Sequence, residues 1–176
     1  MPAVGVSDHK KAAPRSVRCA VVTVSDTRTA ATDTSGALLK SRLDAGGHRI
    51  VSYEILPDEP VRIRDRVRDL AEADVEAVLL SGGTGIAPRD TTFEAVVGLL
   101  DRRLDGFGEL FRSLSYAEIG SAAMLSRAVA GTLGSTVVFA MPGSTAACEL
   151  AVERLILPEL GHIVGLLRPS SGAGSR

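Results

Sequence analysis

The sequence has no tryptophan, and aromatic residues make up only 3% of its 176 residues. Proteins that bind single-stranded nucleic acid stack the bases on aromatic side chains, which are scarce here. The formal net charge is −1, so no broad positive field attracts a phosphate backbone or an anionic membrane surface. We therefore exclude nucleic acid and membrane surfaces as partners, and any anion must be bound by a local site.

Cysteine and long apolar runs are also scarce. The two cysteines, Cys19 and Cys148, lack the spacing of a metal site or redox motif and are expected to be reduced core residues. No apolar run reaches membrane-spanning length, and residues 1–16 lack the apolar centre of a secretory signal. These features predict a cytoplasmic protein.

The remaining composition is that of a single globular domain, with 45% hydrophobic and 23% charged residues. Residues 1–16 and 168–176 mix Pro, Ser, Gly and basic side chains without periodicity. Such segments are typical of flexible tails. We therefore expect one domain over residues 17–167, flanked by two tails.

Strand-like and helix-like segments alternate along this domain. Short β-branched or alternating runs predict strands at 17–24, 49–56, 77–80, 128–133 and 136–141. Helical spacing predicts helices that begin near Asp33 or Thr34, Val61, Thr91, Asp105 and Ser144. Gly134-Ser135 is a two-residue turn that predicts an antiparallel hairpin. The pattern favours a three-layer α/β/α sandwich whose sheet is mostly parallel, with one antiparallel hairpin strand.

Two helices carry more specific signals. Thr91 and Glu94 have the spacing of a capping box, in which each side chain satisfies a free backbone N–H of the other, and this predicts a helix that continues to Leu100. The last helix contains Pro158, which is expected to kink or interrupt it.

Polar or flexible residues follow each of the strands that we expect to be parallel. In an open α/β sheet, ligands bind beyond the carboxyl ends of the strands, so these loops are candidates for one common site. The loops are Ser25-Asp26-Thr27, Pro57-Asp58-Glu59, Ser81 to Asp90 and Pro142-Gly143-Ser144.

The loop Ser81-Gly82-Gly83-Thr84-Gly85 is the strongest candidate for binding an anion. Its glycines allow a sharp turn and leave backbone N–H groups unobstructed, which suits a phosphate, and the next helix would add its dipole. The loop lacks the lysine of a Walker A loop and the last glycine of a dinucleotide-binding motif. A tight strand-to-helix turn without a ligand is the alternative interpretation.

Asp58 and Asp90 would repel a phosphate at this loop unless a hard cation lay between them. Mg²⁺ is typically held by one or two carboxylates together with substrate phosphates, so both residues are candidate metal ligands and catalytic acids. The alternatives are a turn residue for Asp58, a helix cap for Asp90 and turn chemistry for Asp26.

Glu109 and Arg112 lie three residues apart on a predicted helix and could simply pair with each other. Alternatively, Glu109 could accept hydrogen bonds from a heterocycle, while Arg112 or Arg127 binds a phosphate. Neither cysteine has an activating base nearby in the sequence, so a protein nucleophile is not expected.

Taken together, several segments resemble the MoaB/Mog family of molybdenum cofactor biosynthesis proteins, with features of the MoaB branch. They are VVTVSDTR, LPDE, LLSGGTGIAPRDTTFEA, GFGELFR, EIGSAAMLSRAVAG and VVFAMPGSTAAC. Together these segments span most of residues 17–167.

The resemblance implies a molybdopterin-binding α/β domain that adenylylates molybdopterin with Mg-ATP and releases pyrophosphate. Asp58 and Asp90 resemble the two essential acids of the family, and Ser81 to Gly85 resembles its pterin and phosphate loop. The positions that resemble pocket-lining residues are Ser25, Asp26, Glu109, Ser126, Pro142, Gly143 and Ser144.

The branch of the family bears on activity. Thr145 stands where the adenylylating Mog branch usually has proline, and EIGSAAMLSRA matches the MoaB branch, some of whose members keep the fold without catalysis. A catalytically silent molybdopterin-binding or scaffold protein of the same pathway is therefore the alternative function, and a purely structural oligomer is a third. The resemblance also implies a homotrimer or homohexamer and contacts with other molybdenum cofactor enzymes.

Overall fold

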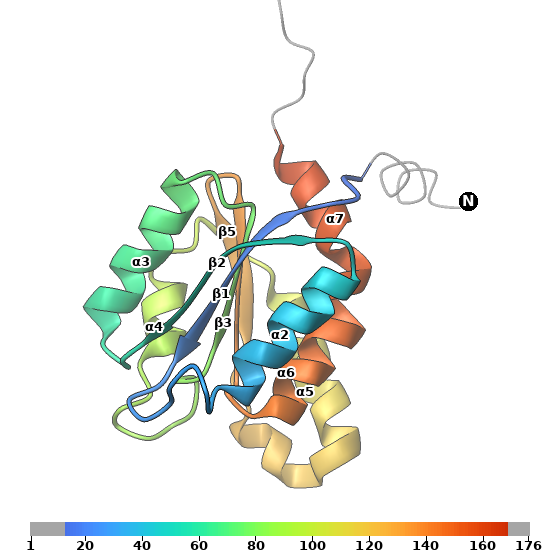
Figure 1. Ribbon diagram of the computed structural model, residues 1–176. Helices are drawn as coiled ribbons and strands as arrows, with labels where there is room; N and C mark the ends of the chain where they lie inside the picture. Colours follow the sequence, from blue (N-terminus) through green and yellow to red (C-terminus); the bar gives the residue numbers. More distant parts are fainter. Residues whose placement is uncertain (1–12, 169–176) are drawn as a thin grey trace, which may run out of the picture.

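The computed structural model describes residues 13–168, which form a sheet between two layers of helices (Figure 1). The six strands run in the order β2-β1-β3-β6-β5-β4. Their bounds are β1 Arg18–Val24, β2 Arg49–Leu56, β3 Ala77–Ser81, β4 Arg102–Arg103, β5 Val129–Leu133 and β6 Thr136–Met141. β1 is parallel to β2 and β3, and β3 to β6, whereas β5 is antiparallel to β6 and to β4. The predicted sandwich with a hairpin strand is confirmed.

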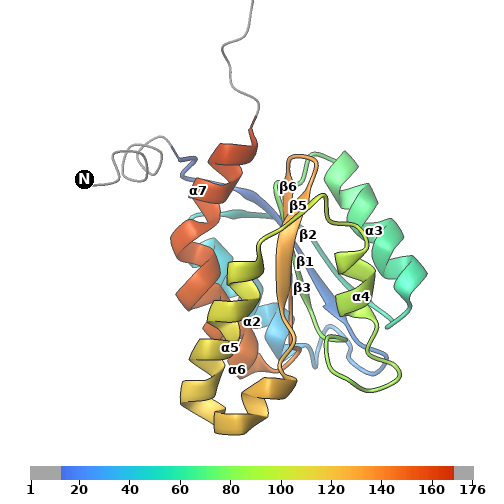
Figure 2. The ribbon, with the colours of Figure 1, turned by 180° about the vertical axis from the view of Figure 1, so that it is seen from behind.

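Helices cover both faces of the sheet. α3 (Pro60–Glu72) and α4 (Thr92–Val97) lie on one face, and the other helices lie on the opposite face (Figures 1 and 2). These others are α2 (Thr34–Ala45), α5 (Asp105–Ile119), α6 (Thr145–Ala151) and α7 (Leu157–Leu167). A 3-10 turn, η1 (Gly120–Leu125), follows α5, and a π-helical turn, η2 (Val152–Ile156), joins α6 to α7.

β1 shows why its sequence is an almost unbroken apolar run. Cys19 and Val21 pack into the core under α2, whereas Ala20 and Val22 pack into the core under α3. All four are completely buried, because successive side chains of a strand point to opposite faces of the sheet. Burying one valine side chain contributes about 1.5–3 kcal/mol, so two covered faces stabilise the central strand strongly.

Two local predictions need correction. The edge strand β4 was not predicted, because the two exposed arginines Arg102 and Arg103 carry no apolar pattern. The helix expected from Thr91 to Leu100 is the six-residue α4, which is too short to supply much dipole. The expected interruption at Pro158 is confirmed. A π-helical turn separates α6 from α7 directly before this proline, which has no N–H to donate to the carbonyl of Arg154 in that turn.

The inner ends of the two expected tails pack against the domain. A Cβ on Gly161 of α7 would lie 2.7 Å from Pro14 O, so residues 13–14 lie closely against that helix. Arg168 pairs with Glu76 through Nη2 at 2.6 Å. The tail predictions for residues 1–12 and 169–176 fall outside the described part of the chain. Within residues 13–168, no helix is long and apolar enough to cross a membrane.

Candidate functional site

The four predicted loops meet at the carboxyl edge of the parallel strands (Figure 1). Ser25 N donates to Leu56 O at 2.8 Å, which joins the first two loops. Gly82 N donates to Met141 O at 3.0 Å, which joins the loop after β3 to the loop after β6. This edge therefore presents the candidate residues on one surface, as the strand order requires.

The glycine loop after β3 has a backbone that other residues rarely adopt. Gly82 and Gly83 have φ of +98° and +66°, and glycine reaches these values without strain. A Cβ on Gly82 would overlap Val24 O, and a Cβ on Gly143 would lie 3.0 Å from Gly82 Cα. The glycines therefore allow close approach of neighbouring loops as well as a sharp turn.

Asp58 lies against Gly83 and is almost buried, with 8% of its surface exposed. Its Oδ1 accepts hydrogen bonds from Thr91 N at 3.1 Å and Thr91 Oγ1 at 2.6 Å. Its Oδ2 faces Gly83 so closely that a Cβ there would overlap it, and no donor within residues 13–168 reaches that oxygen. Asp58 is thus fixed through one oxygen and leaves the other at the loop.

Asp90 lies against Gly85, where a Cβ would be 2.5 Å from its Oδ2. That oxygen accepts a hydrogen bond from Ala87 N at 2.8 Å, while Oδ1 has no donor within residues 13–168. The helix-cap alternative for Asp90 is not what the structure shows, because Asp58 accepts the Thr91 N–H. The two acids therefore contact the same loop, Asp58 at Gly83 and Asp90 at Gly85, and their role as cation ligands stays a prediction.

The predicted capping box is wrong. The Thr91 hydroxyl donates to Asp58, and Glu94 pairs with the guanidinium of Arg127. α4 has no side-chain cap at Thr91. Thr91 and Glu94 thus bind partners from two distant segments and not, as the spacing suggested, each other's backbone N–H groups.

Arg127 holds the glycine loop by its carbonyl oxygens, and its expected contact with a phosphate stays a prediction. Its Nε donates to Thr84 O at 2.8 Å and its Nη2 to Gly85 O at 2.6 Å. The guanidinium also lies 4.6 Å from the ring centre of Phe93. Since the loop carbonyls are turned toward Arg127, this side chain helps to fix the backbone conformation of the loop.

Asp26 forms a second link between the loop after β3 and its neighbours. Arg89 donates to Asp26 Oδ2 at 2.7 Å, and Asp26 Oδ1 accepts from Asp58 N at 3.0 Å. The Arg89 hydrogen bond, followed by that of the Asp58 N–H, lowers the pKa of Asp26. Ser25 Oγ accepts from Arg28 N at 3.1 Å within the same turn. Asp26 therefore connects three loops and is more than a local turn residue.

Arg28 and Asp33 are functional candidates that our sequence reasoning missed. Arg28 Nη2 donates to Gly143 O at 2.9 Å, across 115 residues, and Nη1 pairs with Asp33 Oδ1 at 3.4 Å. Burial alone would raise the pKa of Asp33, but hydrogen bonds from Thr23, Gly36, Tyr53 and Ser35 together lower it. Asp33 was considered only as a helix cap, which it also is.

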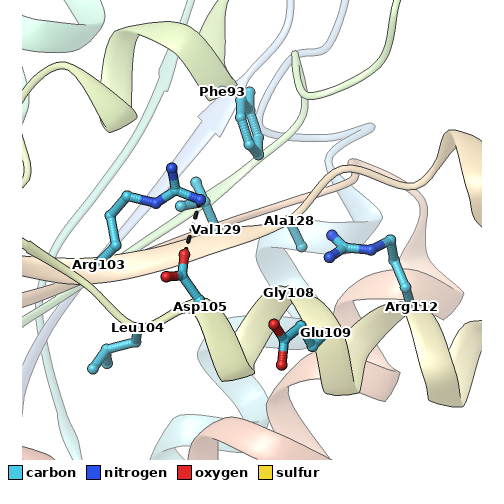
Figure 3. Close-up of a pocket in the computed structure, with 9 residues that line it drawn as sticks. All are labelled: Phe93, Arg103, Leu104, Asp105, Gly108, Glu109, Arg112, Ala128 and Val129. Atoms are coloured by element: carbon cyan, nitrogen blue, oxygen red, sulfur yellow. Dashed lines mark ion pairs between the residues drawn. The ribbon is translucent and has the colours of Figure 1, made fainter.

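Glu109 lies apart from the loop acids, on the wall of a pocket of about 300 Å³ between α5, α4 and β5 (Figure 3). Arg112 of α5 and Phe93 of α4 line the same pocket. Glu109 and Arg112 form no ion pair, so this alternative from the sequence is wrong, whereas Arg103 and Asp105 do pair at 2.9 Å. Phe93 also contacts Arg127, which connects the pocket to the glycine loop.

The other predicted positions have local roles in the structure. Ser81 is buried at the end of β3, and Ser126 follows η1 beside Arg127. Pro142 O accepts the Cys148 thiol at 3.4 Å, and Ser144 Oγ caps α6 by accepting from Ala147 N at 3.2 Å. Burial raises the pKa of Cys148 to about 12, which agrees with an unreactive core thiol.

The ligand atoms available at the glycine loop are carboxylate oxygens, which a hard cation such as Mg²⁺ prefers. Asp58 Oδ2 and Asp90 Oδ1 accept no hydrogen bond within residues 13–168, and the missing Cβ atoms of Gly83 and Gly85 let both carboxylates lie directly against the loop. Within residues 13–168 no group of three or more His, Cys, Asp or Glu could hold a metal ion alone. A cation here would therefore need further oxygens, such as those of a substrate phosphate.

A known protein family matches the same segments of the chain. The family described as "Probable molybdopterin binding domain" matches residues 20–162. The chain belongs to this family. The matched residues form the molybdopterin-binding domain and include every loop of the candidate site. The match confirms the resemblance to MoaB/Mog proteins.

Relatives of this domain agree in sequence and in structure. Molybdenum cofactor biosynthesis protein B of Bacillus cereus is 56% identical over 162 residues, which are 91% of this chain and 96% of the relative. A crystal structure of a molybdenum cofactor biosynthesis protein B has a TM-score of 0.85 at 56% identity, covering 88% of this chain and 98% of the other. The tungsten cofactor synthesizing protein MoaB of Pyrococcus furiosus has a TM-score of 0.81 at 34% identity, covering 89% and 100%.

Proposed function

We propose that the chain acts in molybdenum cofactor biosynthesis as a molybdopterin adenylyltransferase, which transfers AMP from Mg-ATP to molybdopterin and releases pyrophosphate. The observation that supports this most directly is the position of Asp58 and Asp90 against Gly83 and Gly85 of one loop. Two acids beside free backbone amides suit a nucleotide whose phosphates carry a divalent cation.

The nucleophile in this reaction belongs to the substrate. An oxygen of the terminal phosphate of molybdopterin attacks the α-phosphorus of ATP, the bond from that phosphorus to the bridging oxygen breaks, and pyrophosphate leaves with the electron pair. The protein contributes alignment and charge stabilisation. The backbone amides of residues 83–85 would face the phosphates, and Arg127 keeps them in place by holding Thr84 O and Gly85 O.

Mg²⁺, when bound, would offset phosphate charge and polarise the phosphate oxygens. Asp58 and Asp90 are the residues that would hold it, through the oxygens that have no donor in the described chain. Thr91 orients Asp58, and the Ala87 N–H orients Asp90. Both acids are thus positioned by the fold itself.

Glu109 suits recognition of a heterocycle that carries N–H groups. Its carboxylate lies on the wall of the pocket, opposite the ring of Phe93 (Figure 3). The bicyclic ring of a pterin or a purine has a size that a pocket of about 300 Å³ can accept. We include Ser25, Asp26, Ser126 and the loop 142–144 as further substrate contacts of the same proposal.

The test is to incubate purified protein with molybdopterin, ATP and Mg²⁺ and to measure adenylylated molybdopterin and pyrophosphate. Asp58→Asn and Asp90→Asn should each lose product formation, since the carboxylate charge is removed with little change of shape. Asp44→Asn is the matched control, because Asp44 is exposed near the end of α2, at the opposite edge of the sheet. Absence of product with the unmutated protein would contradict the proposal.

One observation favours the alternative of a silent molybdopterin-binding or scaffold protein. Thr145 begins α6, and its Oγ1 contacts Thr34 Oγ1 at 2.9 Å, at the position where the Mog branch usually has proline. In this alternative, calorimetry would detect the binding of molybdopterin, but incubation with Mg-ATP would give no adenylylated molybdopterin.

A homotrimer or homohexamer is part of the proposal, together with contacts to other molybdenum cofactor enzymes. Five large hydrophobic side chains of α5 and η1 are exposed, which is unusual for a surface that remains uncovered. They are Leu110, Tyr116, Ile119, Met124 and Leu125. The mass in solution, measured by light scattering, tests the assembly, and a monomer would contradict it.

A further inference from the structure

Two buried threonine hydroxyls beside the glycine loop have no hydrogen-bond partner within residues 13–168. Thr84 is 1% exposed and Thr92 is completely buried. Among the described residues, two other buried side-chain atoms accept or donate no hydrogen bond by geometry, Arg18 Nε and Arg42 Nε, but each faces a carboxylate oxygen, of Glu76 at 3.7 Å and of Glu153 at 2.6 Å. The two buried hydroxyls without a partner in the described chain are therefore both at the candidate site.

An unpaired buried hydroxyl destabilises a folded protein, and most such groups find a partner. This chain satisfies equally buried threonines elsewhere. Thr23 Oγ1 donates to Asp33 Oδ2 at 2.6 Å, and Thr136 Oγ1 donates to Val75 O at 2.6 Å. The stability of the fold therefore does not explain why the hydroxyls of Thr84 and Thr92 are unpaired.

Thr92 and Asp58 direct their unsatisfied oxygens at the same point. A Cβ on Gly83 would overlap both Thr92 Oγ1 and Asp58 Oδ2. The two oxygens are therefore close neighbours beside Gly83, and Thr92 N also donates to Gly83 O at 2.9 Å. A ligand that reaches these oxygens must therefore shift the Gly83 backbone and lengthen the hydrogen bond from Thr92 N to Gly83 O, and glycine at residues 82 and 83 gives the backbone the freedom to do so.

We infer that the hydroxyls of Thr84 and Thr92 are phosphate-binding groups that the fold leaves unpaired until a ligand arrives. When a phosphate-bearing ligand enters, the loop shifts at Gly83 and both hydroxyls donate to phosphate oxygens. This inference rests on the proposed function, since the ligand is the triphosphate of ATP bound at the same loop. The site thus gives up stability of the free protein in favour of affinity, as functional sites often do.

Valine substitutions test this, because valine replaces the hydroxyl by a methyl group of similar shape. For Thr84→Val and Thr92→Val we expect the Tm without ligand to stay the same or to rise by a few degrees, roughly. The affinity for Mg-ATP, measured by calorimetry, should fall about tenfold or more for each, the effect of a lost hydrogen bond to a charged group. Thr84→Ser and Thr92→Ser should retain the affinity.

Thr136→Val is the matched control, because Thr136 is as buried as Thr92 but has a partner. It should lower the Tm and leave the affinity for Mg-ATP unchanged. If the valine variants at Thr84 and Thr92 lower the Tm as this control does, the hydroxyls serve the fold and the inference is overturned.

Binding separates the remaining outcomes. If both valine variants bind Mg-ATP with the same affinity as the unmutated protein, this inference is overturned and the proposed function is not. Unmutated protein that binds neither Mg-ATP nor Mg-pyrophosphate would overturn the inference together with the proposed function.

Discussion

Asp58 and Thr91 are joined by two hydrogen bonds that end on the same carboxylate oxygen. Thr91 supplies both its backbone N–H and its hydroxyl to Asp58 Oδ1, so one rotamer of the acid is fixed across 33 residues of sequence. Oδ2 then has one orientation, toward Gly83. A site that depends on this oxygen therefore depends on Thr91.

Thr91→Val should loosen Asp58 without removing any charge. The hydroxyl donor is lost, so we expect the free energy of unfolding to fall by about 1–3 kcal/mol. Adenylylation should fall roughly tenfold because the carboxylate becomes less well oriented. Urea denaturation and the product assay measure the two effects, and Thr91→Ser should recover most of both. Full activity in the valine variant would show that Asp58 needs no such support.

Gly83→Ala and Gly85→Ala should abolish binding at the loop. The new methyl groups would overlap Asp58 Oδ2 and meet Asp90 Oδ2 at 2.5 Å, and Gly83 also has a φ of +66°. Calorimetry with Mg-ATP is the measurement. Gly106→Ala is the control, because a Cβ there meets nothing within 4 Å and alanine favours the helix by about 0.5–1 kcal/mol. Normal binding by the Gly83 variant would mean that the acids are not held at the loop.

Arg127→Lys should release the glycine loop while keeping the positive charge. Lysine cannot reproduce the planar fork that contacts Thr84 O and Gly85 O, so the loop should open more often. We expect hydrogen exchange at residues 82–87 to accelerate about tenfold, which corresponds to the loss of about 1.4 kcal/mol of local stability. Arg62→Lys on α3, whose pair with Glu59 is exposed, should leave that exchange unchanged.

Stability should decrease as the pH falls below about 6.5 because of His48. Burial lowers the pKa of this histidine from 6.5, and its Nδ1 accepts a hydrogen bond from Val17 N at 3.3 Å. The unfolded chain therefore binds a proton at higher pH than the folded chain, and stability is lost as the pH drops through that range. Urea titrations between pH 5 and 8 measure the slope. His48→Gln should reduce it, and an equal slope in that variant would assign the effect to other groups.

The sheet could be predicted from the sequence because each strand carries its own signal. The run 49–56 alternates and is bounded by glycine and proline, and β2 has these same limits. The edge strand β4 has no such signal, since two exposed arginines become a strand through their pairing with Gly131 and Thr132. Secondary structure that is imposed by a neighbour cannot be read from local periodicity.

The acids and glycines of the site could also be predicted, because loops at one edge of a parallel sheet must meet. The supporting contacts could not. Arg28 contacts a carbonyl 115 residues away, and Arg127 contacts the loop across 43 residues, so neither role follows from spacing. The capping box failed for the same reason, since Asp58 and Arg127 offered Thr91 and Glu94 better partners.

The close approach of Gly143 to Gly82 limits how this site can diversify. A side chain at Gly143 would meet the backbone of Gly82, and a side chain at Gly82 would meet that of Val24. A substitution at Gly82 or Gly143 would therefore force the neighbouring backbone to move. New ligand specificity is more accessible at the rim of the site, at positions such as Ile86 and Glu109, whose side chains are exposed and free to vary in size.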